Sequence, residues 1–265
     1  MGRRPLDAEL VRRGLAGSRA EAQEAVQAGH VTVRGAPATK STTLVGTDEA
    51  LVVGGPARPF VSRGGEKLAV ALDAFAIDPT GRDCLDAGAS TGGFTDCLLQ
   101  RGARHVVALD VGYGQLAWKI RTDPRVTVME KTNVRDLRPD LLPYRPSLLT
   151  ADLSFISLGL VMKALLEVTE PAADLVLLIK PQFEAEREQV ERGGVIRDPN
   201  VWRRVIEEVA VKAREAGAGT AGLIVSPLTG PAGNVEFLLH AKAAWHGDGL
   251  DIDGAIEAAG RSGTS

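Results

Sequence analysis

Short apolar runs alternate with segments of helical periodicity from about residue 60 onward. In the segment 199–216, Pro199 suits the first turn of a helix, and Val201, Val205 and Val209 recur on one face. Apolar runs of strand length predict strands over residues 83–87, 105–110, 126–129, 148–152, 174–180, 220–225 and 235–241. Strands and helices that alternate in this way predict an α/β domain with a mostly parallel, seven-stranded sheet.

A different pattern occupies the first 55 residues. Helices are predicted over 5–13 and from Ser18 to about residue 28, where Ser18 and Glu21 fit a capping box. Short strands are predicted at 31–33 and 51–53, so this part is a small α+β unit. The expected organisation is a first domain over 1–55, a Gly/Pro-rich linker over 56–62, an α/β domain over 63–244 and a flexible tail over 245–265.

Composition and charge narrow the class of protein. Hydrophobic residues make up 44% of the chain and charged residues 25%, as in soluble globular proteins. No apolar run has the length of a membrane span or a signal peptide, so we expect no stable membrane insertion. Cys84 and Cys97 lack metal-ligand spacing, which fits a reduced cytoplasmic location. The sequence does not fix the oligomeric state, and a monomer is favoured.

Charge is unevenly distributed along the chain. The net charge is −3, but residues 1–60 hold 8 Lys and Arg against 6 Asp and Glu. The N-terminal unit is therefore slightly basic and the remainder acidic. This asymmetry permits a nucleic-acid partner at the N-terminal end without requiring one.

A glycine-rich turn follows the first predicted strand of the α/β domain, within Asp86–Asp96. Glycine permits sharp turns and close approach to a ligand, and Asp110 at the end of the next strand suits a ribose hydroxyl. The spacing differs from that of NAD sites and resembles motif I of Rossmann-like methyltransferases, which implies S-adenosylmethionine as cofactor. The candidate cofactor-binding residues are Asp86, Gly88, Ser90, Gly92, Gly93, Phe94, Asp110 and Asp136. The alternative is a plain tight loop.

Four charged residues form the candidate catalytic group: Lys67, Asp152, Lys180 and Glu236. Asp152 and Lys180 end apolar strands, and the carboxyl ends of parallel strands share one edge of a sheet. Glu236 faces the same edge if the last strand is antiparallel. Each residue also has an ordinary interpretation: a surface lysine for Lys67, a helix cap for Asp152 and an exposed strand acid for Glu236.

The order Lys-Asp-Lys-Glu resembles the tetrad of FtsJ-type ribose 2′-O-methyltransferases. Over residues 3–242 the chain resembles the TlyA family, in which an S4 domain precedes an FtsJ-like domain. The segments that carry this resemblance are Ser62–Leu68, Asp86–Asp96, Asp110–Leu116, Asp152–Leu158, Lys180–Glu184 and Gly230–Glu236. The resemblance implies a Rossmann-like S-adenosylmethionine methyltransferase domain that modifies ribosomal RNA, with cytidine as the implied target.

The N-terminal unit resembles an S4 RNA-binding module in three stretches: residues 4–11, 18–22 and 26–35. Cations in such a module neutralise phosphates and give affinity with little sequence preference. The candidate phosphate contacts are Arg3, Arg4, Arg12, Arg13, Arg19, Arg34 and Lys40. The alternative is an ordinary solvated surface.

The mechanism implied is attack of a ribose 2′-hydroxyl on the methyl group of the cofactor. Lys180 is the candidate base, because partial burial and neighbouring cations would favour its neutral form. Asp152 and Glu236 would orient the lysines, and Lys67 would steady the hydroxyl or a phosphate. Two alternatives remain open: a membrane-active hemolysin, tested by lysis of red cells, and a non-catalytic RNA-binding ribosome assembly factor, tested by cofactor titration.

Overall fold

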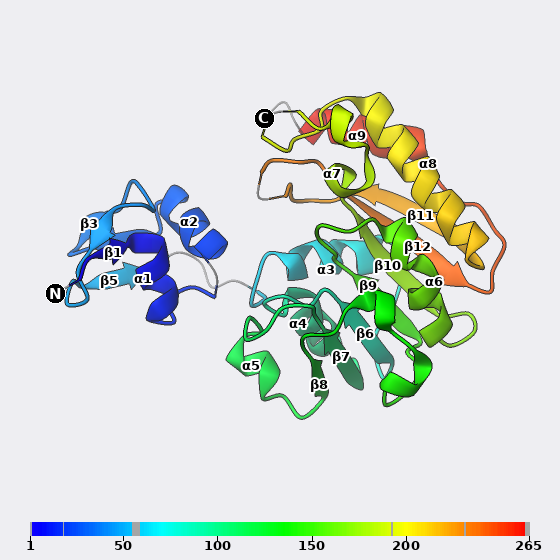
Figure 1. Cartoon of the computed structure of the whole chain (residues 1–265), viewed down its shortest axis with the longest axis horizontal. Helices are drawn as coiled ribbons and strands as arrows, with labels where there is room; N and C mark the ends of the chain where they lie inside the picture. Colours follow the sequence, from blue (N-terminus) through cyan, green and yellow to red (C-terminus); the bar gives the residue numbers. More distant parts are fainter. Residues whose placement is uncertain (1, 18, 55–58, 192, 231, 263–265) are drawn as a thin grey trace. The chain divides into compact units, whose positions relative to one another are not determined.

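The computed structural model describes residues 2–17, 19–54, 59–191, 193–230 and 232–262 (Figure 1). The chain divides into two units at the bond between Ser62 and Arg63. Each unit has its own hydrophobic core and is described separately below. Ser18, the N-cap that the sequence predicts, lies outside the described residues.

The N-terminal unit combines two helices with two small antiparallel sheets. Its core is formed by apolar side chains from both helices and from the strands, including Leu6, Leu10, Val26 and Val31. The helices are α1 (Leu6–Arg12) and α2 (Arg19–Gln27), one sheet pairs β1 (Arg4–Pro5) with β4 (Leu44–Val45), and the other has β2 (Val31–Val33) between β3 (Ala36–Pro37) and β5 (Leu51–Val53). The two-residue strands were not predicted, because so few residues show no alternation.

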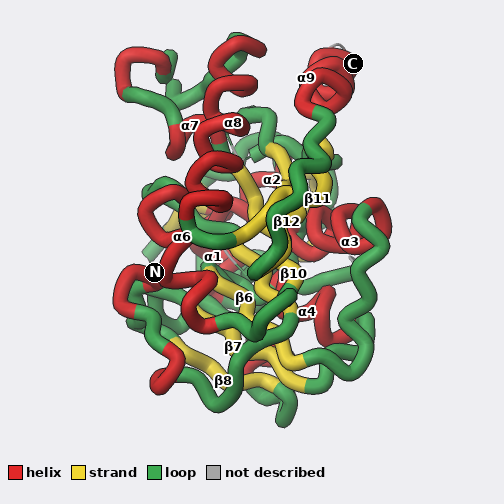
Figure 2. The backbone as a smooth tube through the Cα atoms, turned by 90° about the vertical axis from the view of Figure 1, so that its right-hand side faces the viewer, coloured by secondary structure: helices red, strands yellow, loops and turns green. Residues whose placement is uncertain are grey.

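A seven-stranded sheet forms the centre of the second unit (Figure 2). Its strands are β6 (Asp83–Ala87), β7 (His105–Leu109), β8 (Val126–Met129), β9 (Leu148–Ala151), β10 (Asp174–Ile179), β11 (Ala218–Val225) and β12 (Phe237–Ala243). The strand order is β11-β12-β10-β9-β6-β7-β8. Strand β12 runs antiparallel to both of its neighbours, β10 and β11, and the other neighbouring strands are parallel. The predicted α/β class and seven-stranded, mostly parallel sheet are confirmed.

Helices cover both faces of this sheet. In Figure 2, α3 (Gly64–Ala74) and α4 (Gly93–Gln100) lie on one side, and α6 (Leu158–Val168) and α8 (Pro199–Glu215) lie on the other. Short helices follow three strands on the chain: α5 (Trp118–Arg121), the 3-10 turn Val134–Asp136 and α7 (Pro181–Glu184). The strands are apolar on both faces. On the face covered by α6 and α8, their side chains form one hydrophobic core with these helices.

The C-terminal segment differs from its prediction. Residues 245–265 are expected to be a flexible tail, but Ile252–Ser262 form helix α9. This helix packs against β11 and α8, where Ala255 and Ala259 are buried. The sequence did not predict this helix because glycine and small polar residues around these alanines obscure their helical spacing. Among the described helices, none combines the length and apolar character needed to cross a bilayer.

Candidate active site

The glycine-rich turn between β6 and α4 contains positions where a side chain would be strained by the backbone conformation and would meet neighbouring atoms. Gly88 has φ +88°, and a Cβ there would lie 2.4 Å from the carbonyl oxygen of Asp152. Gly92 has φ +95°, and a Cβ there would lie 3.0 Å from Leu116 Cδ1. The turn is therefore packed directly against the loop that follows β9, and only glycine fits at Gly88.

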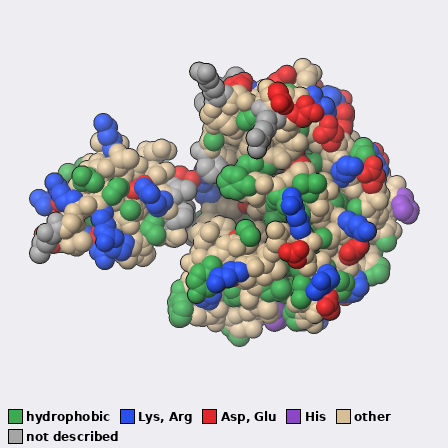
Figure 3. All heavy atoms as spheres, viewed as in Figure 1, with side chains coloured by type: hydrophobic (Ala, Val, Ile, Leu, Met, Phe, Trp, Pro, Cys, Tyr) green, Lys and Arg blue, Asp and Glu red, His purple; other side chains and the backbone are tan. Residues whose placement is uncertain are grey.

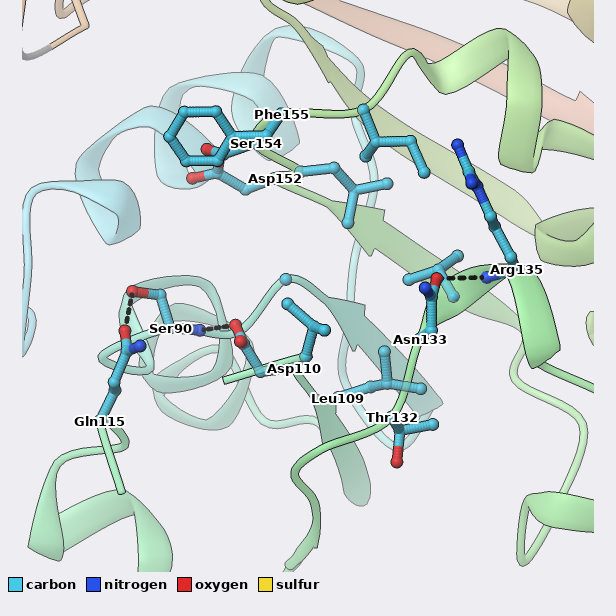
Figure 4. A pocket seen from close by; sticks show the side chains of 15 residues that line it. Ser90, Leu109, Asp110, Gln115, Thr132, Asn133, Arg135, Asp152, Ser154 and Phe155 are labelled. Atoms are coloured by element: carbon cyan, nitrogen blue, oxygen red, sulfur yellow. Dashed lines mark hydrogen bonds between the residues drawn. The ribbon is translucent and has the colours of Figure 1, made fainter. Parts of the chain in front are cut away.

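A cavity of about 560 Å³ opens beside this turn, at the carboxyl ends of β6, β7 and β9 (Figure 4). Its volume is within the usual range for a small-molecule site. Its walls are formed by Gly88, Ser90, Leu109, Asp110, Val111, Gln115, Thr132, Asn133, Val134, Arg135, Asp152, Leu153, Ser154, Phe155 and Ile156. Of the predicted cofactor residues, Gly88, Ser90 and Asp110 line this cavity.

Asp110 is fixed by the backbone on both sides. The Ser90 N–H donates to its Oδ2 at 2.7 Å, and the Gly112 N–H donates to its Oδ1 at 2.6 Å. A carboxylate oxygen has two lone pairs, so each oxygen can accept one further hydrogen bond from a ligand. The carboxylate therefore presents fixed acceptors to the cavity, as a ribose-binding acid requires.

Asp86 lies beneath the turn and does not line the cavity. Its carboxyl is fully buried and accepts hydrogen bonds from Thr95 Oγ1 at 2.6 Å and from Thr150 Oγ1 at 3.3 Å. Burial, reinforced by the nearby charge of Asp152, raises the pKa of Asp86 to about 7. The strand register explains this position: Asp86 pairs with Ala108, two residues deeper in the sheet than Asp110.

The other predicted cofactor residues also lie outside the cavity wall. Gly92, Gly93 and Phe94 are buried around the first turn of α4, while Asp136 is exposed at the end of the 3-10 turn. Wall residues that sequence reasoning did not single out include Gln115, Asn133, Ser154 and Phe155. Gln115 and Phe155 lie in segments that resemble the TlyA family. This resemblance is the feature of the sequence that could have identified them as site residues.

The four candidate catalytic residues form two ion pairs. Lys180 Nζ lies 2.6 Å from Asp152 Oδ1 and donates to Ser154 Oγ at 2.9 Å. Among the described residues Asp152 Oδ1 has no partner with hydrogen-bond geometry, so its contact with Lys180 is an ion pair alone. Lys67 Nζ donates to Glu236 Oε2, and both of these side chains are buried.

The sheet brings the two ion pairs together. Ile179 and Phe237 are opposite each other in the antiparallel register of β10 and β12, so the adjoining Lys180 and Glu236 meet at one edge. The Asp152 N–H donates to the Ala87 carbonyl at 3.0 Å, which connects this group to the glycine-rich turn. The ordinary interpretations of Lys67 and Glu236 as surface groups are wrong. The N-cap of α6 is Ser157 and not Asp152.

An exposed aromatic side chain stands beside Lys180. Phe155 is 91% exposed, has φ +63°, and its ring centroid lies 5.0 Å from that of Phe183. Lys180 Nζ is 5.9 Å from the centre of the Phe183 ring. The two rings are tilted by 48° to each other, so the exposed face of Phe155 is the one that a planar ligand could stack on.

Neither cysteine belongs to this site. Cys84 in β6 and Cys97 in α4 are fully buried, and burial raises the pKa of each thiol to about 12. They behave as small apolar core groups and are not activated nucleophiles.

On the face of the N-terminal unit seen in Figure 3, the charged side chains are mainly Lys and Arg. Arg4 and Lys40 are exposed, and Arg19 is bound at 2.9 Å to Asp7. Arg13 is different, because it donates to Glu9 Oε1 and to three backbone carbonyls of residues 46–49. Arg13 therefore stabilises the unit itself and keeps few donors for a phosphate.

Comparison with known proteins places both units. A family model described as an S4 domain matches residues 4–50, and one described as an FtsJ-like methyltransferase matches residues 60–243. The chain is 55% identical over 235 residues to the 16S/23S rRNA (cytidine-2′-O)-methyltransferase TlyA of Mycobacterium tuberculosis, covering 88% of each chain. It is 40% identical to Hemolysin A of Brachyspira hyodysenteriae, covering 89% of this chain and 98% of the relative.

A solved structure has the same architecture. A proposed hemolysin from Streptococcus thermophilus superposes with a TM-score of 0.80 at 37% identity, covering 98% of this chain and 97% of that one.

Proposed function

Because this chain belongs to the TlyA family of S4-containing, FtsJ-like methyltransferases, we propose that it methylates the ribose 2′-hydroxyl of cytidine in ribosomal RNA. S-adenosylmethionine is the methyl donor in this proposal, and ribosomal RNA or a ribosomal subunit is the partner. Such a substrate implies work in the cytoplasm. All of the proposed catalytic residues come from one chain, so a monomer would suffice.

One observation carries the proposal: two lysine–carboxylate pairs lie at the carboxyl edge of the sheet, beside a cavity with a fixed carboxylate. The pairs are Lys67–Glu236 and Lys180–Asp152. Backbone contacts join this edge to Gly88 of the cavity wall. Cofactor and hydroxyl can therefore be held next to each other without any movement of a strand.

The residues of the cavity fit the proposed cofactor. Asp110 offers fixed acceptors for ribose hydroxyls, and Gly88 and Ser90 form the adjoining backbone turn. S-adenosylmethionine supplies a methyl group already activated by a sulfonium. The protein must then orient the ribose and remove the proton of its 2′-hydroxyl.

The Lys180–Asp152 pair can take up this proton as a unit. The carboxylate of Asp152 lies 2.6 Å from Lys180 Nζ, so it can receive one of its protons. Transfer of one ammonium proton to Asp152 leaves a neutral amine, which then accepts the hydroxyl proton. The pair ends with one more proton than it began with.

The other two tetrad residues have a supporting role in this proposal. Buried Glu236 holds Lys67 in place, so the ammonium of Lys67 can stabilise negative charge that develops on the ribose oxygen. The exposed ring of Phe155 offers its face to the target base.

The test is ribose methylation mapped on ribosomal RNA. Deproteinised 16S and 23S rRNA would be incubated with the purified protein and S-adenosylmethionine, and protected sites located by alkaline hydrolysis. We expect new 2′-O-methylcytidine that requires both protein and cofactor. Absence of ribose methylation on free rRNA and on isolated ribosomal subunits would contradict the proposal.

A further inference from the structure

A buried carboxylate holds two arginines at the C-terminal end of helix α1. Glu9 is 0% exposed and accepts hydrogen bonds from Arg12 Nε at 2.8 Å and from Arg13 Nε at 2.8 Å. The bonds from Arg12 and Arg13 lower the pKa of Glu9 to about 2, so the carboxylate is ionised at neutral pH. Arg12 keeps a side chain that is 44% exposed.

A second buried carboxylate holds two more arginines from distant parts of the unit. Oε1 of Glu49 lies 3.2 Å from Arg3 Nη2 and 3.1 Å from Arg34 Nη2, and those two side chains are 61% and 69% exposed. A backbone bond from Gly46, and then the bond from Arg3, lower the pKa of Glu49. Arg13 joins the two clusters, because it also donates to the Glu49 carbonyl at 2.7 Å.

We propose that Glu9 and Glu49 are positioning residues, which hold Arg3, Arg12 and Arg34 in fixed orientations to receive RNA phosphates. A guanidinium has five N–H donors, and each of these arginines spends only one or two on its carboxylate. The remaining donors stay available in the exposed part of the side chain. The inference rests on the proposed action on ribosomal RNA.

Two opposing effects decide whether a negative charge behind the arginines helps RNA binding. Fixing one long side chain at an interface costs about 2- to 12-fold in affinity, and an arginine that is already held avoids much of this cost. A carboxylate some 6–8 Å behind a phosphate repels it in water by about two- to threefold. Glu49 holds two of the proposed phosphate-binding arginines, so fixed orientation outweighs repulsion there. Glu9 holds only Arg12 of this set, so its effect is smaller.

The Asp7–Arg19 pair lies outside this arrangement. Asp7 and Glu9 are two residues apart on α1, so their side chains leave the helix in different directions. Asp7 binds Arg19 and Gln23 of helix α2. The proposal therefore assigns phosphate binding to the network of Glu9 and Glu49 and leaves Arg19 out of it.

The test compares two substitutions that each remove one negative charge from the full-length protein. Glu49→Gln releases two arginines, whereas Asp48→Asn changes an exposed acid for which the described residues provide no arginine partner. Binding of deproteinised 16S and 23S rRNA would be measured by filter retention. We expect Glu49→Gln to bind about five- to tenfold more weakly, although its net charge is more favourable, and Asp48→Asn to bind no more weakly.

The same substitution in a protein that lacks both arginines separates a positioning role of Glu49 from a general loss of folding. In an Arg3→Met/Arg34→Met protein, Glu49→Gln has no arginine to release and should leave binding unchanged or tighten it. The inference is overturned if Glu49→Gln binds as tightly as the parent, if Asp48→Asn weakens binding equally, or if Glu49→Gln still weakens binding in the double-methionine background. Failure of the parent protein to methylate rRNA would instead overturn the proposed function.

Discussion

For charged residues near the ends of strands, the position along the strand predicts whether the side chain reaches the candidate active site. Asp110, Asp152 and Lys180 each follow the last residue of a parallel strand, so the sequence places them at one edge. Asp86 is the fourth of five residues in β6 and is buried instead. Its register in the sheet, which apolar patterning does not reveal, decides the difference. The partner of each lysine was also beyond the sequence, since one pair depends on how β9 and β10 align and the other on where α3 places Lys67.

At the residue scale, Lys180→Ala should abolish methyl transfer and leave cofactor binding nearly intact. Loss of a proton acceptor lowers the turnover number by about 10²- to 10⁴-fold, while the cavity wall keeps its carboxylate Asp110. The measurement is single-turnover methylation of rRNA together with calorimetric cofactor titration. The control is Lys163→Ala, which removes an exposed lysine of α6. Undiminished turnover of Lys180→Ala would remove Lys180 from its assigned role.

Asp86 gives a pH-dependence of stability with a definite sign. Its folded pKa of about 7 lies above the usual value of 3.8, so the folded protein binds the proton more tightly than the unfolded chain. The stabilisation is fully present below about pH 4 and is lost as the pH rises to about 7, by up to about 1.4 kcal/mol per pH unit.

Asp86→Asn should remove this contribution. The free energy of unfolding would be measured by urea denaturation from pH 4 to pH 8 for both proteins. We expect the variant to gain stability relative to the parent as the pH rises, with the gain complete above about pH 7. A difference that stays constant across this range would show that folding does not raise the pKa of Asp86.

At the element scale, strands and long helices were predictable because many residues repeat one signal. The strands of the sheet are apolar runs, buried except for the half-buried edge strand β8 and parts of β11, and α8 has a strong apolar face. Pattern did not predict the two-residue strands β1, β3 and β4 or helix α9. These elements are held by tertiary contacts, which leave no repeated signal in the sequence. Glycine spacing predicted the turn after β6, but only the structure shows that Gly88 contacts the loop after β9.

Gly88→Ala should damage this junction. The substitution adds a Cβ at φ +88° and 2.4 Å from the Asp152 carbonyl, so it combines backbone strain with a clash against main chain. We expect a loss of about 2–4 kcal/mol in the free energy of unfolding and weaker cofactor binding. The matched control is Gly81→Ala, at φ +70° with no atom within 4 Å, which should cost only about 1–2 kcal/mol. Equal losses would show that the contact with Asp152 is unimportant.

At the scale of the whole molecule, the part proposed to bind RNA and the part proposed to bind the cofactor differ in net charge. The first 60 residues carry a small net positive charge and the remainder is acidic, although the arginines that we propose bind RNA are partly neutralised by Glu9 and Glu49. Total charge therefore says less about RNA binding than the arrangement of individual guanidinium groups does. The sequence identified these arginines, but it could not show that Arg13 is occupied within the unit.

Salt should weaken RNA binding far more than cofactor binding. About four phosphate contacts imply roughly a hundredfold loss of rRNA affinity between 50 and 200 mM KCl, because bound cations are released on association. S-adenosylmethionine affinity, set by short contacts in a cavity, should change little over the same range. Filter binding and calorimetry at several salt concentrations make the comparison. An rRNA affinity that is insensitive to salt would argue against phosphate recognition by arginines.

The contact between Lys67 and Glu236 joins positions 169 residues apart, near the two ends of the second unit. A nascent chain carries its first lysine early in translation but lacks the acid that fixes it until the last strand of the sheet has been made. The tetrad can therefore assemble only after all seven strands of the sheet have entered the growing chain, or are about to.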